Sequence, residues 1–434
     1  MKISVSEDKF DRIDIILHCA LFVALPVSVR LTSWVVWLLL TIWLLRRGLK
    51  NRVKYAVRSK SVWVLAMPVF YMITTLLYTE QFSEGIRSLE NKFFLVVFPV
   101  IMSSAVFTQR KINTLLRGYT ISIFCWSLVC LTMGLYNFFS ADASFANMAG
   151  DVYNRVVSPW GFLTNIKLVE PISLSPIYMS MFVGLAVFIC LYLYNESKAS
   201  PRQRFAIAIL ILYFLIFDLL LGARMGIIAL FFAWCFYIVK FLLKNHTKGA
   251  SFLKVSGFLI LLLLLTSLLI YNPVLQKRFL KDFAEHEIPE EVDGWNSVNL
   301  RSAIWRCSIG LIKERPLLGY GIGALDTYRE NCYQQYSFYG VFGTDLNSHN
   351  QYLEYLMIGG FPLLLILLIS LAYSYYQAKS MRSGLFQIFI LFLAMNMLTE
   401  SLLNVQKGLI FYSYFCSLFM FGLRFKHLTS RHIA

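Results

Sequence analysis

Apolar runs long enough to cross a lipid bilayer recur from one end of this 434-residue chain to the other. A spanning helix needs roughly 18 to 20 mostly apolar residues, which few soluble cores contain even once. Hydrophobic residues make up 58% of the chain and charged residues only 15%, whereas soluble domains carry roughly 25% charged residues. These features exclude a soluble enzyme, a disordered chain and a disulfide-stapled secreted domain. They predict an all-α, polytopic membrane protein.

Counting the apolar runs predicts about twelve transmembrane helices. These are expected to begin near Ile13, Leu31, Ser61, Phe93, Gly118, Leu174, Phe205, Met225, Val255, Gln351, Gly384 and Gly408. The chain then divides into three parts. Residues 1–271 hold nine helices with short loops, residues 272–350 form one large loop, and residues 351–434 hold three helices and a tail.

The net charge of +16 comes from lysines and arginines that gather in short connections between the apolar runs. Arg46–Lys60, for example, contains seven basic residues and no acidic one. Similar groups follow at every second connection, at residues 110–117, 198–204, 240–254, 379–382 and 424–431. Because such loops face the cytoplasm, both termini are predicted to be cytoplasmic. This pattern also argues against a nucleic-acid partner.

The large loop Asn272–Asn350 lies on the opposite side in this map, and it holds eight Lys/Arg and ten Asp/Glu residues. Residues 299–315 are predicted to form an amphipathic helix that is N-capped by Asn299 and ended by Pro316. Three glycines follow, Gly319, Gly321 and Gly323, and are expected to form a flexible turn. Two cysteines, Cys307 and Cys332, either form a disulfide in an oxidising compartment or leave Cys307 packed as a thiol.

One arginine stands at the edge of an apolar hairpin. From Phe205 to Ile238 the only charged residues are Asp218 and Arg224, and Arg224 ends the motif Gly222-Ala-Arg224 at the predicted tip. A guanidinium in this position usually has a partner or a ligand. Arg224 is therefore either an anion ligand, an ion-pair partner of Asp218, or a side chain that extends into the interface.

Three arginines of the large loop, Arg301, Arg306 and Arg329, could bind phosphate oxygens through their paired N–H groups. Arg301 and Arg306 are five residues apart, which is about 140° around a helix. They cannot both face one small group without help from the loop. The alternative is that each is a solvated charge paired with a nearby acid.

His349 is the residue best placed to act as a base. Ser348 and Gln351 have the spacing of a capping box, which would make His349 the first residue of a helix. The positive end of a helix favours a neutral imidazole and can also face an anion. The alternative is an ordinary surface histidine. No metal-ligand motif occurs in the polar segments, so neither a catalytic metal nor a cofactor is predicted.

The order of these motifs around one large loop resembles the O-antigen ligase and O-antigen polymerase superfamily of bacterial envelope glycosyltransferases. The resemblance is strongest from Leu174 to Pro362. It is carried by Ser175-Pro176-Ile-Tyr178, Gly222-Ala-Arg224, Arg301-Ser-Ala-Ile-Trp305-Arg306, Glu314-Arg-Pro316-Leu-Leu-Gly319-Tyr-Gly321, His349-Asn350-x-x-Leu353 and Gly359-Gly360.

The resemblance implies transfer of a glycan from undecaprenyl pyrophosphate to a sugar hydroxyl at the periplasmic face of the bacterial inner membrane. It further implies a metal-independent reaction in which arginines hold the pyrophosphate and a histidine is the base. The residues concerned here are Arg224, Arg301, Arg306, Arg329 and His349. The first hypothesis is an O-antigen ligase with lipid A–core as acceptor. The alternatives are an O-antigen polymerase, which joins lipid-linked repeats, and a lipid-linked glycan flippase or other transporter.

Overall fold

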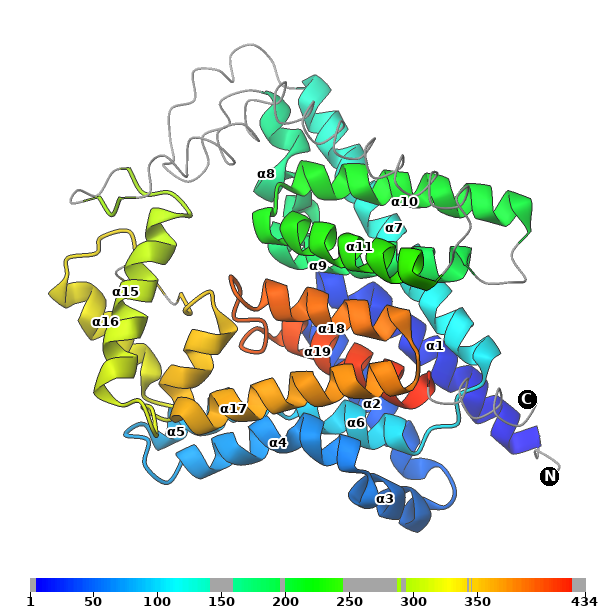
Figure 1. Cartoon of the computed structure of the whole chain (residues 1–434), viewed down its shortest axis with the longest axis horizontal. Helices are drawn as coiled ribbons and strands as arrows, with labels where there is room; N and C mark the ends of the chain where they lie inside the picture. The colour runs from blue at the N-terminus through cyan, green and yellow to red at the C-terminus, as the bar shows by residue number, and fades with distance from the viewer. Residues whose placement is uncertain are drawn as a thin grey trace. The chain divides into compact units, whose positions relative to one another are not determined.

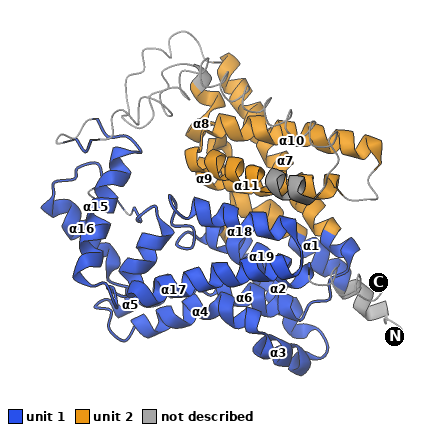
Figure 2. Ribbon diagram, viewed as in Figure 1, with its two compact units in different colours: residues 1–18, 32–112, 285–434 blue, residues 19–31, 113–284 orange. Residues whose placement is uncertain are grey.

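Helices make up all of the regular structure that is described (Figure 1). The computed structural model describes residues 5–140, 159–195, 200–244, 287–289, 294–341, 343–344 and 346–423. Contacts divide the chain into two compact units (Figure 2). Unit 1 contains residues 1–18, 32–112 and 285–434, and unit 2 contains residues 19–31 and 113–284. The predicted all-α class is confirmed for the described part of the chain.

Unit 1 holds most of the helices that matter for the candidate site. They are α2 (Val29–Leu45), α3 (Leu49–Arg58), α4 (Lys60–Thr75), α5 (Phe82–Lys92), α6 (Phe94–Ser103), α15 (Asn299–Glu314), α16 (Leu325–Gln335), α17 (Gln351–Ser380), α18 (Gly384–Asn396) and α19 (Gln406–Ser417), with a π-helical turn at Leu418–Gly422. The helix α1 (Val5–Val27) starts in unit 1 and ends in unit 2. Within unit 1, α17 packs against α4 and α18, while α6 packs against α4 and α19.

Unit 2 is built around a buried helix, α9 (Pro176–Tyr194), which packs against α10 (Pro201–Leu221) and α11 (Arg224–Lys244). Most of α9 is buried, as expected for a helix that is apolar all round. The unit also contains α7 (Gln109–Ser140), a short helix α8 (Asn165–Val169), and two 3-10 turns at Pro159–Leu163 and Glu170–Ile172. The Tyr119 hydroxyl of α7 donates to the Phe182 carbonyl of α9 at 2.9 Å.

Several helices are suited to a membrane. Among the described residues, α7, α9, α10 and α17 are long and apolar enough to cross one. The number is five only if α2 and α3, which are bent by 114°, are counted together as one span. The helices α4 and α18 and residues 224–236 are apolar but shorter. A helix lies at each expected start of a span except the one near Val255, which is outside the described residues. The number twelve therefore stays a prediction.

Ion pairs and hydrogen bonds within unit 1 bring together connections that the basic residues assign to the same side of the membrane. At one end, Arg46 pairs with Asp11, and Lys111 Nζ lies 2.6 Å from Asp14 Oδ2. At the other end, the Tyr78 hydroxyl donates to the Leu318 carbonyl at 2.6 Å, which joins the α4–α5 connection to the large loop. Each group combines only connections that the charge pattern assigns to one side of the membrane. The side itself stays a prediction.

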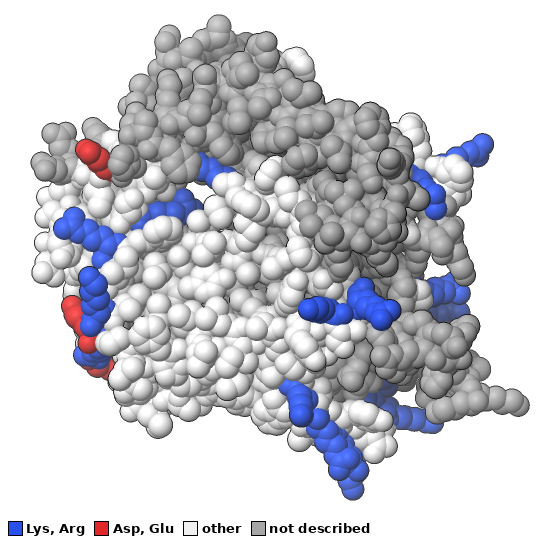
Figure 3. Space-filling model, in the orientation of Figure 1, with Lys and Arg blue, Asp and Glu red and all other residues white. Residues whose placement is uncertain are grey.

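The surface of unit 1 shows the same division. Figure 3 shows an uncharged face over α4 and α17, with basic side chains gathered toward the α3 end. Both signs of charge occur toward the end that carries α5 and α16. A wide uncharged face with charges at its two ends is the arrangement expected of a bundle that spans a bilayer.

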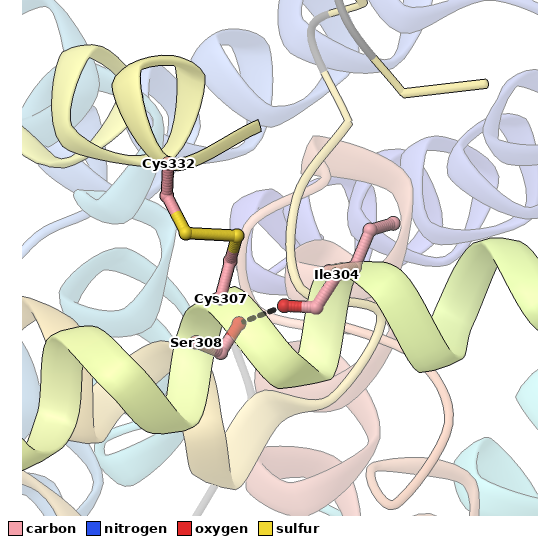
Figure 4. Close-up of a disulfide and its surroundings, with 4 residues drawn as sticks. All are labelled: Ile304, Cys307, Ser308 and Cys332. Carbon is pink, nitrogen blue, oxygen red and sulfur yellow. Dashed lines mark hydrogen bonds between the residues drawn. A yellow bond between two sulfur atoms is a disulfide. The ribbon is translucent and has the colours of Figure 1, made fainter. Parts of the chain in front are cut away.

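The described part of the large loop has a small core of its own, formed by Trp295, Leu300, Ala303, Ile304, Cys307, Tyr333, Phe338 and Val341. Cys307 on α15 and Cys332 on α16 form a disulfide, with their Cα atoms 5.9 Å apart (Figure 4). Of the two alternatives that the sequence allowed, the structure has the disulfide. It links the helix of Arg301 and Arg306 to the helix of Arg329.

The predicted amphipathic helix exists as α15, but its start differs from the prediction. Asn299 is the first helical residue rather than the N-cap. Asn296 accepts the Asn299 backbone N–H at 3.2 Å, and the Asn299 side chain accepts the Asn296 N–H at 2.8 Å. The two asparagines thus cap the first turn reciprocally, in the manner of a capping box.

The glycine turn after α15 is packed rather than flexible, so that expectation is wrong. Helix α17 is broken at Gly359 and Gly360, where the backbone leaves helical geometry. The turn fits against this break, with Gly321 N donating to the Ile358 carbonyl at 2.9 Å. Gly319 has a φ of 66°, and a Cβ there would lie 2.4 Å from the Met357 carbonyl oxygen. Only glycine can adopt this conformation at such close approach.

Candidate active site

His349 lies two residues before α17 and has a left-handed backbone with a φ of 47°. A residue other than glycine adopts this conformation only where its surroundings hold it. Its backbone N–H donates to Asn347 Oδ1 at 2.9 Å. The next N–H, of Asn350, donates to Ser401 Oγ at 3.2 Å. These two hydrogen bonds therefore hold the backbone at His349 and fix the position from which its side chain projects.

The expected capping box at Ser348 is not formed, so His349 does not open the helix. Asn350 is the N-cap, and its Oδ1 accepts the backbone N–H groups of Tyr352 and Leu353 at 3.0 and 3.1 Å. The Ser348 hydroxyl instead donates to the Asn350 carbonyl at 2.8 Å. Asparagine accepts these amides at least as well as serine does, and its placement moves the helix start two residues further along the chain.

Glu400 lies beside the imidazole of His349. Its Oε2 is 3.4 Å from His349 Nδ1. The Glu400 side chain is 5% exposed and the His349 side chain is 19% exposed. Glu400 belongs to the connection between α18 and α19, so the contact joins segments 51 residues apart. A carboxylate at one ring nitrogen sets the tautomer and leaves the other nitrogen to accept a proton. This is the arrangement of a base with an orienting acid.

A second acid, Glu354, holds the residue before His349. Glu354 is buried in the first turn of α17 and accepts the Ser348 backbone N–H at 3.0 Å. Its oxygens also accept from Arg329 Nη1 at 3.0 and 3.1 Å and from Asn404 Nδ2 at 2.6 Å. The carboxylate therefore connects α16, the start of α17 and the α18–α19 connection at one point.

Arg329 is committed to carboxylates. It is 6% exposed, and besides Glu354 it pairs with Asp326 on its own helix. Burial alone would lower the pKa of the guanidinium, but Glu354 and Asp326 outweigh it, and the net pKa lies above its usual value. An anion could bind this group only by displacing one of the two carboxylates, and the pair with buried Glu354 is costly to break. The contacts of Arg329 are those of a structural ion pair.

Arg301 lies on the face of α15 that also carries Trp305. Trp305 is one turn further along the same face, and its Nε1 donates to the Ser348 carbonyl at 2.9 Å. Arg301 is half-buried, and its Nη1 donates to the Ser297 carbonyl at 2.9 Å. Arg301 is therefore one helical turn, a rise of about 5.4 Å, before Trp305, which is hydrogen-bonded to the backbone next to His349.

Arg306 points elsewhere on α15. Its side chain is exposed, and the guanidinium lies 4.9 Å from the ring centre of Tyr336. This agrees with the expected 140° between Arg301 and Arg306. Of the three loop arginines, only Arg301 shares a helix face with the residue that contacts the histidine segment.

Arg224 is the first residue of α11, directly after the turn that closes the α10–α11 hairpin. Gly222 makes that turn with a φ of 58°, as the C-cap of α10. The predicted hairpin tip is therefore confirmed. The side chain is half-buried at a helix N-terminus, where N–H groups and the helix dipole favour anions. Arg224 belongs to unit 2, whereas His349 and the other three arginines belong to unit 1.

In the described residues, no three His, Cys, Asp or Glu side chains come together as a metal site would require. His286, the other histidine of the large loop, lies outside the described residues. In unit 2, Ser175 caps α9 through its hydroxyl, which accepts the Ile177 N–H at 3.3 Å, and Pro176 is the first helical residue. That motif is thus a helix start.

Comparison with known families found one match. Residues 206–368 match the family model described as O-antigen ligase. This segment of the chain is similar to the O-antigen ligase family. The match supports the resemblance to the O-antigen ligase and polymerase superfamily that the motifs indicate. The matched segment contains Arg224, all three loop arginines and His349. No curated protein matches the chain.

The sequence did not single out Glu354 and Glu400 as functional residues. Both are acids in apolar surroundings, one in the first turn of a membrane helix and the other between two such helices. Acids in such positions usually have a partner. Glu400 lies outside the matched segment, 51 residues after His349, so only the folded chain shows which base it accompanies.

Proposed function

We propose that this protein is an O-antigen ligase-type glycosyltransferase that moves a glycan from undecaprenyl pyrophosphate to a sugar hydroxyl of lipid A–core at the periplasmic face. The observation that carries the proposal is the His349–Glu400 pair, which lies 3.4 Å apart at the junction of the large loop and α17. The histidine is within the matched O-antigen ligase segment. A base held by a buried acid suits glycosyl transfer to a hydroxyl, because it can take the hydroxyl proton during the attack.

In the proposed step, the acceptor hydroxyl attacks the anomeric carbon of the donor sugar. His349 takes the hydroxyl proton on the ring nitrogen that faces away from Glu400. The bond from the anomeric carbon to the pyrophosphate oxygen breaks, and undecaprenyl pyrophosphate leaves with the bonding electrons. Arginine N–H groups stabilise the charge that develops on the leaving group. The reaction needs no metal in this proposal.

The arginines have different roles in this mechanism. We assign Arg224 and Arg301 to the pyrophosphate, because each is half-buried. Arg224 opens a helix, and Arg301 shares a helix face with Trp305, which contacts the histidine segment. Arg306 is the weaker ligand candidate, since it lies over Tyr336. Arg329 acts as a positioning residue: its pair with Glu354 holds the Ser348 N–H and hence the backbone before His349.

An O-antigen polymerase would use the same donor and the same residues, with another lipid-linked repeat as acceptor. The lipopolysaccharide profile of a strain that lacks this protein separates the two. For a ligase, the core carries no polymer and polymer accumulates on the lipid carrier. For a polymerase, the core carries a single repeat. A normal profile would contradict both and would favour a transporter with another cargo.

The chemistry is tested with purified protein in a transfer assay that contains EDTA. His349→Ala should bind the lipid-linked donor normally and transfer about 10²- to 10⁴-fold more slowly, which is the usual loss when a base is removed. His286→Ala is the matched control and should keep its turnover. Near-normal transfer by His349→Ala, or loss of wild-type transfer in EDTA, would contradict the metal-free histidine mechanism.

The proposed side of the membrane has a separate test. Reporter fusions at Gly294 in the large loop and at Asn51 in the basic connection should report opposite sides, the first periplasmic and the second cytoplasmic. Signals from the same side would overturn the topology on which the periplasmic site depends.

A further inference from the structure

Helix α3 is a short basic helix set sharply across the end of the helix before it. It runs from Leu49 to Arg58 and makes an angle of 114° with α2. Gly48 permits the turn, with a φ of 78°. Only one residue, Ser59, separates α3 from the apolar helix α4. A short basic helix joined in this way to two apolar helices is suited to the membrane interface.

The angle between α2 and α3 is held by Arg52. Its Nη1 donates to the Arg47 carbonyl at 2.7 Å, and its Nη2 donates to the carbonyls of Trp43 and Arg46. The Trp43 carbonyl lies in the last turn of α2, where carbonyls have no partner within the helix, and the other two belong to the residues directly after α2. The guanidinium also lies 5.4 Å from the Trp43 ring centre. Arg52 therefore stabilises the bend between α2 and α3.

The other basic residues of α3 are exposed and share one face. Lys50, Lys54 and Arg58 follow one another at intervals of four residues, which places them along one stripe of the helix. No acidic residue occurs anywhere from Arg46 to Lys60. The stripe carries three positive charges that the helix itself does not neutralise.

An apolar stripe runs beside the basic one. Leu49, Val53 and Val57 are each one residue before a basic residue, and they are 38%, 43% and 56% exposed. An acidic protein or a nucleic acid would match the charges but would leave these side chains in water. A surface of anionic headgroups above acyl chains matches both stripes at once.

We propose that α3 is an interfacial helix that binds anionic phospholipid, with Lys50, Lys54 and Arg58 on the headgroup phosphates and Leu49, Val53 and Val57 among the upper acyl chains. The partner is the lipid of the leaflet in which α2 ends and α4 begins. The proposal does not depend on the glycosyltransferase activity.

The test uses the full-length protein in a neutral detergent, titrated with phosphatidylglycerol or with phosphatidylcholine of the same acyl chains while the melting temperature is followed. Phosphatidylglycerol should raise the melting temperature at lower concentration than phosphatidylcholine. Each basic residue near such a surface contributes about fivefold in affinity. The Lys50→Gln, Lys54→Gln, Arg58→Gln triple variant should therefore need at least tenfold more phosphatidylglycerol for the same rise.

Two controls keep the result specific. The charge-conserving Lys50→Arg, Lys54→Arg, Arg58→Lys variant should respond like the wild type. The Arg87→Gln, Lys313→Gln variant, which removes exposed charges from α5 and α15, should do so as well. An unchanged response of the triple glutamine variant would overturn the proposal. Equal stabilisation by phosphatidylcholine, or by soluble glycerol phosphate in place of the lipid, would also overturn it.

Discussion

Trp305 Nε1 donates to the Ser348 carbonyl at 2.9 Å, and this one bond ties the arginine-bearing helix α15 to the backbone beside His349. Glu354 holds the same residue from the other side through the Ser348 N–H. Both peptide groups that flank Ser348 are thus bonded to different parts of unit 1, which fixes where His349 stands.

Glu400→Gln should slow transfer without weakening donor binding. Glutamine is close to glutamate in size but carries no charge, so it orients the imidazole less well and does not stabilise the imidazolium that forms. A hydrogen bond to a charged group contributes about 1.5–3 kcal/mol, which predicts a rate about 10- to 100-fold lower. Turnover and donor KM of the purified variant give the result. Glu90→Gln, which changes an exposed acid on α5, is the control and should behave as wild type.

Arg329→Lys separates a positioning role from a ligand role. Lysine keeps the charge but cannot reach both Glu354 and Asp326 with one rigid group. If Arg329 positions His349, kcat should fall while KM for the lipid-linked donor stays unchanged. If it binds pyrophosphate, KM should rise instead. Lys313→Met on the exposed face of α15 is the control for changes to the loop surface.

The ion pair between Arg329 and Glu354 also predicts how substitutions of the two residues change the free energy of unfolding. Removing one partner leaves a buried charge alone and costs about 3–5 kcal/mol of unfolding free energy. Arg329→Met and Glu354→Met should each be strongly destabilised, whereas the double variant should recover much of the loss. Independent, additive losses in a thermal or denaturant titration would mean that the two side chains do not depend on each other.

The Cys307–Cys332 disulfide should stabilise the large loop. It closes a separation of 25 residues, which the chain-entropy estimate translates into about 3 kcal/mol. Cys307→Ser and Cys332→Ser should melt at lower temperature than the wild type, and Cys125→Ser, at an exposed thiol, should not. Alkylation without reductant should leave both cysteines unmodified. A mass shift at both residues would show instead that they are free thiols.

Lys92 should make stability depend on pH above neutrality. Its ammonium is buried and donates to the Leu403 carbonyl at 2.6 Å. Burial lowers its pKa to about 8, although Glu354 and Asp326 oppose the shift. Between pH 8 and about pH 10 the unfolded chain then binds a proton that the folded chain does not, so this residue favours folding as pH rises. The difference in unfolding free energy between wild type and Lys92→Met should shift in favour of the wild type by up to about 1 kcal/mol per pH unit. A difference that is flat or falls over this range would contradict the assignment.

The sequence predicted a helix at each apolar run within the described residues, because an apolar run depends on local composition. The amphipathic pattern of residues 299–315 was sufficient for the same reason, and Pro316 ended the helix as expected. The side of the membrane on which each connection lies stays a prediction from the clustered lysines and arginines.

What the sequence could not predict depends on contacts across the chain. Serine and asparagine both cap helices, so the pattern at Ser348 could not reveal that Asn350 is the cap. The three glycines after α15 are typical of a mobile turn, and only the break at Gly359 and Gly360 explains why they are packed. Two further contacts join segments far apart in sequence. They are the contact of Glu400 with His349 and the ion pair of Arg329 with Glu354.

Arg224 is the residue for which sequence and structure make the simplest experiment. It opens α11 at a hairpin tip, where it is either a pyrophosphate ligand or a side chain whose charge is held by the interface or by Asp218. Arg224→Lys keeps the charge and would satisfy the second role, but it loses the paired N–H groups that bind phosphate oxygens bidentately. A ligand role therefore predicts that Arg224→Lys raises the donor KM at least roughly tenfold, the effect of losing one charge-assisted hydrogen bond, and that Arg224→Ala raises it further. Arg204→Lys, on the exposed first turn of α10, controls for a basic residue of unit 2 outside the tip. If both Arg224 variants transfer glycan with the wild-type KM and kcat, the guanidinium is only an interfacial charge, and the pyrophosphate must be held by Arg301 and its neighbours in the large loop.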